Sequence, residues 1–161
     1  MREKVLEKLK ELNIEFKEVE HEPVFTIEDM DALGDVFEGA KICKNLFVRD
    51  QKGKRHFLIV VPEEKRVPLA ELATKIGSTK LSFASEERLM KYLKLKPGAV
   101  TPLAVVNDEN SAVEVYFDEE LKKEKVLGVH PCVNTSTILI SQENLEKYVT
   151  ANNNKLKYIK I

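Results

Sequence analysis

The sequence predicts an α/β fold of the α+β type, in which helices surround a mixed, largely antiparallel sheet or partial barrel. Short apolar and β-branched runs alternate along the chain with amphipathic helical segments. Two pairs of these runs are separated by turn residues typical of hairpins, and hairpins require antiparallel pairing. The 161 residues contain no repeat and no linker, so we expect a single domain over residues 1–161.

The N-terminal part of the chain predicts an outer helix followed by a central hairpin. Apolar residues at helical spacing define the first helix, and Thr26 with Asp29 resembles a capping box that opens a second one before Gly34. The turn residues 50–54 join two strongly apolar runs. The elements expected here are helices over residues 2–12 and 26–33, and strands over 14–19, 40–49 and 55–61.

The C-terminal part predicts three helices and further strands. Gly77 is expected to close the first of these helices, and Ser85 to cap the second. Residues 107–110 have the composition of a second hairpin turn. The elements expected here are helices over residues 68–76, 85–93 and 141–148, and strands over 81–84, 103–106, 113–117, 135–140 and 156–161.

Composition and charge exclude several classes of protein. Lys and Arg number 26 against 27 Asp and Glu, so no overall basic field marks a nucleic-acid-binding protein. No apolar run reaches the length of a membrane span, and the N-terminus lacks a secretory signal. The two cysteines do not form a disulfide framework, which favours the cytoplasm. The three histidines have no zinc-binding spacing, so we expect neither metal nor cofactor.

Lys44 is the first candidate functional residue. If Ile42, Leu46 and Val48 point inward, alternation along the strand puts Lys44 on the same face. A buried lysine needs a partner, so an inward Lys44 predicts a wet cleft with an anionic or carbonyl ligand. The alternative is the opposite strand phase, with Lys44 in solvent.

The segment from Pro97 to Pro102 is the second candidate. Gly98 permits backbone angles closed to other residues, and the amides between the two prolines are not committed to a regular ladder. Such a loop can hold an oxyanion in acyl transfer, although glycine and proline also bracket many plain loops.

The segment 128–137 is the third, because it places His130 and several hydroxyl and amide side chains at a strand entrance. Turn chemistry explains the same residues equally well. Cys132 next to it could act as a nucleophile, but a small packed residue is the simpler interpretation.

The central hairpin is also locally basic, which suits either binding to a phosphate backbone or a solvated hairpin tip. Its basic residues are Lys41, Lys44, Arg49, Lys52, Lys54 and Arg55.

Taken in order, these motifs resemble one known family. Lys44-Asn45-Leu46-Phe47, the loop 97–102, and His130-Pro131 followed by Asn134-Thr135 look like the YbaK/ProX family of aminoacyl-tRNA deacylases, free-standing relatives of the prolyl-tRNA synthetase editing domain. The likeness covers essentially the whole chain. It is nearest to the ProXp-ala branch, also called PrdX, and implies that family's editing-domain fold.

The resemblance implies hydrolysis of mischarged tRNA, in this branch Ala-tRNA(Pro). Lys44 would hold the terminal adenosine and the ester region, and the amides of Gly98, Ala99, Val100 and Thr101 would stabilise the oxyanion. Asn45 and His130 would orient the 3′ end and the amino acid. A size-limiting wall after the His-Glu-Pro segment is expected from Phe25, Thr26, Ile27, Met30 and Leu33.

Two alternatives remain open at this point: a Cys-tRNA(Pro) deacylase of the YbaK type, and a non-catalytic tRNA-binding regulatory module. The expected partner is mischarged tRNA(Pro), for which binding through the phosphates would be salt-sensitive. A prolyl-tRNA synthetase or an elongation factor that presents the substrate is a further candidate. We expect a monomer that binds neither DNA nor a membrane.

Overall fold

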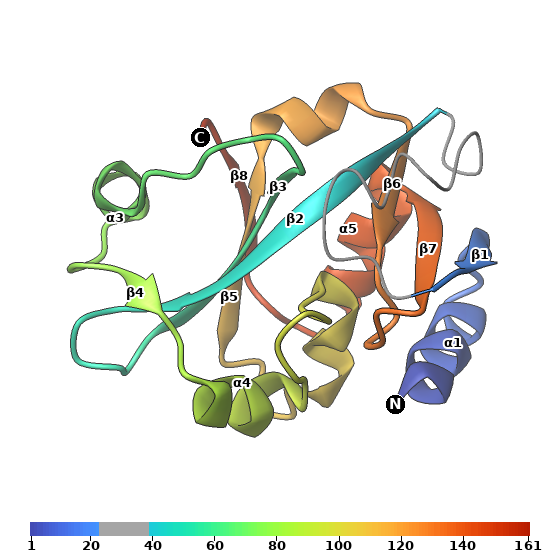
Figure 1. Ribbon diagram of the computed structural model, residues 1–161, viewed down its shortest axis with the longest axis horizontal. Helices are drawn as coiled ribbons and strands as arrows, with labels where there is room; N and C mark the ends of the chain where they lie inside the picture. Colours follow the sequence, from blue (N-terminus) through green and yellow to red (C-terminus); the bar gives the residue numbers. More distant parts are fainter. Residues whose placement is uncertain (23–38) are drawn as a thin grey trace.

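A computed structural model describes residues 1–22 and 39–161 of the chain (Figure 1). Within these ranges helices and strands are interspersed, as the sequence predicts. The helices are α1 (Arg2–Glu11), α3 (Leu69–Ile76), α4 (Glu86–Leu93) and α5 (Gln142–Ala151), with the 3₁₀ helices η2 (Pro102–Asn107) and η3 (Glu119–Lys123). The strands are β1 (Phe16–Glu20), β2 (Ala40–Arg49), β3 (His56–Pro62), β4 (Ser82–Phe83), β5 (Val113–Asp118), β6 (Val126–Val129), β7 (Ser136–Ser141) and β8 (Leu156–Ile159).

The described strands form one mixed sheet in the order β1-β7-β6-β2-β3-β5-β8, with β4 paired to β2 off this path. Four of its pairings are antiparallel and three, β2 with β6, β3 with β5 and β5 with β8, are parallel. The long strand β2 crosses the molecule from β6 and β7 at one end to β4 and α3 at the other (Figure 1). This confirms the expected mixed sheet with surrounding helices.

Two apolar clusters cover the two faces of β3, and this explains why the whole strand is buried. Leu58 and Val60 pack with α1, α4, η2 and α5, whereas Phe57, Ile59 and Val61 pack against α3. The neighbouring strand β2 divides in the same way, with Phe47 in the first cluster and Val48 in the second. A strand buried on both faces reads as a continuous apolar run, which is the pattern of residues 56–62.

The central hairpin and the helix ends confirm the sequence predictions closely. β2 and β3 pair antiparallel from Cys43↔Pro62 to Arg49↔His56. The Asp50 carboxylate closes the turn by accepting the Lys54 and Arg55 amides. Ser85 caps α4, Ser141 caps α5, and Gly77 ends α3 in the left-handed conformation.

The second predicted hairpin is wrong. Residues 103–106 belong to the 3₁₀ helix η2, and β5 pairs in parallel with β3 and β8. Pro102 begins η2 and has no amide for a ladder, while the Thr101 hydroxyl accepts the Leu103 amide. The Asp108 carboxylate then accepts the amides of Ala112 and Val113, so side chains satisfy backbone groups that a hairpin would use.

Strand β6 was not predicted, because four residues that include Gly128 carry a weak strand signal. A side chain at Gly128 would collide with its neighbour, since an added Cβ would lie 2.5 Å from Ile42 Cδ1. Glycine therefore leaves room for the Ile42 side chain across the β2–β6 pair. The helix expected over 26–33 lies outside the described residues.

Candidate active site

The candidate site lies at a gap in the sheet, where one edge of β2 has no described partner strand between β6 and β4. β6 pairs with this edge only from Ala40 to Ile42, and β4 joins it only at Val48 and Arg49. Between Cys43 and Phe47 no described strand occupies the edge. The carbonyl of Phe47 accepts the Ala84 amide there, so by alternation Asn45 also turns its backbone groups toward the gap. The sequence motif around Lys44 therefore borders an open edge.

Lys44 and His130 leave the same end of the β2–β6 pair. The register ends at Ile42↔Gly128; Lys44 lies two positions further along β2, and His130 directly follows Val129, the last residue of β6. Because residues two apart in a strand share a face, Lys44 projects to the side on which Ile42 meets Gly128. His130 lies near the same side, because its ring neighbours that of His21, which contacts Thr137 beside Gly128. Val48 belongs to the second apolar cluster and Leu46 packs against it, so of the two phases left open by the sequence the structure has the one with Lys44 on an inward face. Its ammonium is partly buried and donates to the carbonyl of Lys65.

The His130 ring is oriented by the backbone of β7. Its Nδ1 lies 2.9 Å from the Ser136 carbonyl, which can only accept, so Nδ1 carries the proton. Burial lowers the pKa of His130 and the His21 ring adds to this effect, while the Ser136 carbonyl opposes it. The centroids of the two imidazole rings are 6.4 Å apart. A neutral His130 with this tautomer presents Nε2 as a hydrogen-bond acceptor.

A partly buried polar network holds the same segment from the side of β1 and the N-terminal helix. Arg2 donates to both Glu18 carboxylate oxygens at 2.6 Å, and the Ser136 hydroxyl donates to Glu18 at 2.7 Å. The hydrogen bonds from Arg2 lower the pKa of Glu18. The N-terminal helix is thereby tied through β1 to the residue whose carbonyl holds His130.

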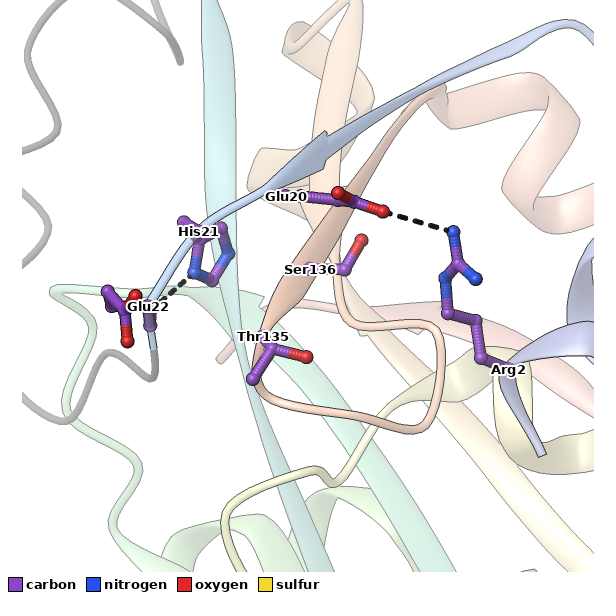
Figure 2. Close-up of a pocket in the computed structure, with 6 residues that line it drawn as sticks. All are labelled: Arg2, Glu20, His21, Glu22, Thr135 and Ser136. Atoms are coloured by element: carbon purple, nitrogen blue, oxygen red, sulfur yellow. Dashed lines mark hydrogen bonds and ion pairs between the residues drawn. The ribbon is translucent and has the colours of Figure 1, made fainter.

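A polar pocket of about 710 Å³ opens beside this network (Figure 2). Arg2 reaches toward Glu20 across it, and His21 stands at the opposite end, with Nδ1 2.7 Å from the Glu22 carbonyl. His21 Nε2 lies 2.8 Å from the hydroxyl of Thr137 on β7. Sequence analysis missed Arg2, Glu18 and Ser136, since contacts between residues so far apart in the chain leave no local pattern.

The loop after α4 forms the other side of the gap. Gly98 has a positive φ of +92°, and Thr101 is fully buried with its hydroxyl capping η2. The Ala99 amide donates to the Lys96 carbonyl at 3.3 Å. The amides of Gly98, Val100 and Thr101 have no hydrogen-bond partner among residues 1–22 and 39–161. Gly98 and Val100 line the small pocket shared with Asn45, so their amides are donors available to an oxyanion, whereas Thr101 is fully buried and does not line this pocket.

Asn45 and the Gly98 loop share one small pocket of about 200 Å³. The Asn45 carboxamide oxygen is buried and has no hydrogen-bond partner. A buried polar atom without a partner costs about 1–3 kcal/mol, so this atom points to a ligand. The residues that line the pocket are Asn45, Leu46, Phe47, Phe83, Ala84, Glu86, Leu89, Pro97, Gly98 and Val100.

The structure therefore brings the candidate residues to the two sides of one gap. Lys44 and His130 share one face of the sheet, while Asn45 points to the other face, toward the Gly98 loop. The expected size-limiting residues lie outside the described part of the chain: Phe25, Thr26, Ile27, Met30 and Leu33.

The two thiols are poorly suited to nucleophilic attack. Cys132 is packed in the first apolar cluster, and burial raises its pKa to about 12. Burial has the same effect on Cys43. Such thiols carry almost no thiolate at neutral pH. No cluster of metal-ligating side chains occurs among the described residues.

The basic hairpin is less available than its sequence suggests. Lys41 pairs with Glu64 at 2.6 Å, and Arg55 pairs with Glu114 at 3.0 Å. Lys52 and Lys54 at the turn are exposed and have no ion pair within the described ranges. Among the helices that the structure describes, none has the length and apolarity to cross a membrane.

Comparison with known proteins decides the family. Residues 21–148, most of the chain, match the family model described as the aminoacyl-tRNA editing domain. The chain belongs to this family. An aminoacyl-tRNA editing domain removes a wrong amino acid by hydrolysing its ester with tRNA, so the chain is an aminoacyl-tRNA deacylase. The gap in the sheet, bordered by Lys44, Asn45 and the Gly98 loop, is its candidate active site.

Curated relatives of this editing domain span its whole length. The prolyl-tRNA editing protein ProX of Acetoanaerobium sticklandii is 50% identical, covering 98% of this chain and 95% of the relative. The prolyl-tRNA synthetase associated domain-containing protein 1 of Danio rerio is 34% identical, covering 92% and 81%.

Solved structures share the fold. A candidate trans-editing enzyme for prolyl-tRNA synthetase matches with a TM-score of 0.74 at 19% identity, over 99% of this chain and 96% of that one. A hypothetical protein matches equally well, with a TM-score of 0.74 at 20% identity over 95% and 96%. These likenesses concern the fold alone.

Proposed function

We propose that this editing domain acts in trans on mischarged tRNA(Pro), with Ala-tRNA(Pro) as its substrate, and releases alanine and free tRNA. The observation that carries the proposal is the pair of amides of Gly98 and Val100, which have no partner within the described chain and line the pocket beside the unpaired edge of β2. The amide of Thr101 follows them in the chain. The 50% identical relative is named for prolyl-tRNA editing, which supports tRNA(Pro) as the carrier.

The reaction is attack of water on the ester carbonyl. The new bond joins the water oxygen to the carbonyl carbon, and the bond to the ribose oxygen breaks, with the water proton passing to that oxygen. The amides of the Gly98 loop polarise the carbonyl and hold the charge of the tetrahedral intermediate. The vicinal ribose hydroxyl of the substrate assists the water by proximity.

Lys44 and His130 hold the substrate around this step. One ammonium proton of Lys44 is engaged by the Lys65 carbonyl, which leaves two donors for the ribose and ester oxygens. Nε2 of neutral His130 accepts a hydrogen bond from the α-ammonium group of the amino acid. Asn45 orients the 3′ end from the opposite side of the gap. The residues expected to limit side-chain size, from Phe25 to Leu33, complete this proposal.

Alanine is the kind of amino acid that a separate editing site must remove, because it is smaller than the proline for which the synthetase pocket is shaped. A synthetase pocket shaped for proline loses only about 1–3 kcal/mol when it binds a smaller side chain, so it rejects alanine poorly. A pocket of about 200 Å³ at the Gly98 loop suits a small amino acid attached to the ribose. A prolyl-tRNA synthetase or an elongation factor that presents the substrate remains part of the proposal as a partner.

The test is a panel of tRNA(Pro) charged with alanine, cysteine, serine or proline, with release of the amino acid followed under single turnover. The proposal predicts rapid release of alanine and protection of proline. Preferential release of cysteine would move the substrate to the YbaK type. Binding of every aminoacyl-tRNA without release would contradict hydrolysis and favour the regulatory module.

A further inference from the structure

Phe83 is a large apolar side chain that the fold leaves in solvent. It is 62% exposed, more than any other large apolar residue in the described chain. Its strand β4 is only two residues long and joins β2 where the gap closes. A single exposed apolar residue is ordinary on a protein surface. Its place beside the candidate active site is what distinguishes Phe83.

The register of β4 fixes the face to which Phe83 belongs. Phe83 lies directly opposite Val48, so the two side chains share a face, which is also the face of Lys44. Val48 lies four positions after Lys44 along β2, a span of about 13 Å at roughly 3.3 Å per residue. Phe83 also lines the pocket of the Gly98 loop, which extends around the open edge of β2, because Leu46 from the face of Lys44 and Asn45 from the opposite face both line it. The ring therefore stands within one or two nucleotides of the proposed ester.

Two independent features of this region point to a polar, anionic ligand. The buried carboxamide oxygen of Asn45 in the same pocket has no partner. The segment between α4 and the Gly98 loop carries Lys94 and Lys96, both exposed and without an ion pair among the described residues. An aromatic ring, an unsatisfied amide oxygen and lysines without ion pairs among the described residues together suit a nucleotide, with its flat base, polar base edge and phosphate.

We propose that Phe83 is the stacking platform for a base of the single-stranded 3′ end of the tRNA. This inference rests on the proposed function, because the ester there is attached to a 3′ terminal nucleoside whose base is unpaired. A base has a flat π face that a lone exposed ring can cover, whereas a protein partner needs a larger apolar patch. Stacking then adds affinity along the strand without reading sequence.

Fluorescence tests the contact without requiring catalysis. The chain contains no tryptophan, so Phe83→Trp introduces a unique fluorophore. Titration with the RNA trinucleotide CCA is expected to quench it. Met90→Trp is the matched control, because Met90 is 43% exposed on α4 and does not line the pocket. Equal quenching of the two variants, or none at Phe83→Trp, would overturn the inference.

Kinetics provide the second arm. Phe83→Ala is expected to raise the KM for Ala-tRNA(Pro) by roughly 5- to 150-fold, as for loss of a stacked base, and to change kcat little. Phe83→Tyr should restore the wild-type KM, and Phe83→Leu should not, although it keeps an apolar side chain. An unchanged KM in Phe83→Ala would reject the platform while leaving the deacylase intact. If the wild type released no amino acid, the proposed function would fail, and the fluorescence arm would still decide the stacking.

Discussion

Substitution of Gly98 by alanine separates the role of the loop amides from general backbone stability. Gly98 has φ of +92°, and an added Cβ would meet no atom within 4 Å. The methyl group therefore fits, and strain comes only from the backbone angle. Gly77, at the end of α3, has φ of +71° and equally open space, so Gly77→Ala imposes the same kind of strain far from the Gly98 pocket.

The expected loss of stability is similar for the two variants. A non-glycine residue in the left-handed region costs about 1–2 kcal/mol, partly offset by the smaller entropy of the unfolded alanine chain. We therefore expect each variant to lower the free energy of unfolding by about 1 kcal/mol. At Gly98 the exposed loop can relieve this strain by rotating peptides, which turns the free amides away from the oxyanion. Loss of one such donor typically lowers kcat by about 10²–10³.

The assay is single-turnover release of alanine from Ala-tRNA(Pro), alongside urea unfolding of the wild type and both variants. Gly98→Ala should lose at least about tenfold in rate, and Gly77→Ala should keep the wild-type rate at a comparable loss of stability. A wild-type rate in Gly98→Ala would refute the oxyanion role of the loop. Equal slowing of both would attribute the effect to stability alone.

Three further predictions concern individual residues. Burial, with Arg88 Nη1 3.0 Å from Nε2, lowers the pKa of His56 to about 4. As the pH falls, the unfolded chain binds a proton at His56 before the folded chain does, so the free energy of unfolding decreases by about 3 kcal/mol between about pH 6.5 and pH 4. Urea unfolding of His56→Gln should lack this decrease. An equal decrease in His56→Gln would show that His56 is not its source. Cys132→Ala should keep most of the deacylation rate, whereas inactivation would revive a thiol mechanism. Glu18→Gln should loosen Ser136, so ¹⁵N NMR should detect a mixture of His130 tautomers; a pure Nδ1–H tautomer would contradict this coupling.

The elements that could be predicted are those whose signals are local. The β2–β3 hairpin combines two long apolar runs with a turn at Asp50, and helix α4 has its own cap in Ser85. The strand predicted over residues 103–106 was wrong because a short apolar run has the same sequence pattern in a buried 3₁₀ helix and in a strand. What distinguishes the two is the set of hydrogen bonds from Thr101 and Asp108, which sequence patterns reveal poorly.

The candidate site divides in the same way. The phase of Lys44 along β2 follows from alternation, and the resemblance to the editing family supplied the motif. The gap beside β2 could not be predicted, because it depends on where β6 leaves and β4 joins. The exposure of Phe83 and the support of His130 by Glu18 likewise arise from contacts between distant parts of the chain.

Release of alanine from Ala-tRNA(Pro) by the wild type and by Lys44→Ala, with Pro-tRNA(Pro) as the protected control, tests the central claim most directly. The wild type should hydrolyse the first substrate and spare the second. Lys44→Ala should remain folded and slow alanine release by at least about tenfold, equivalent to roughly 1.4 kcal/mol of transition-state stabilisation. An unchanged rate in Lys44→Ala would contradict the site, and no alanine release by the wild type would contradict the substrate.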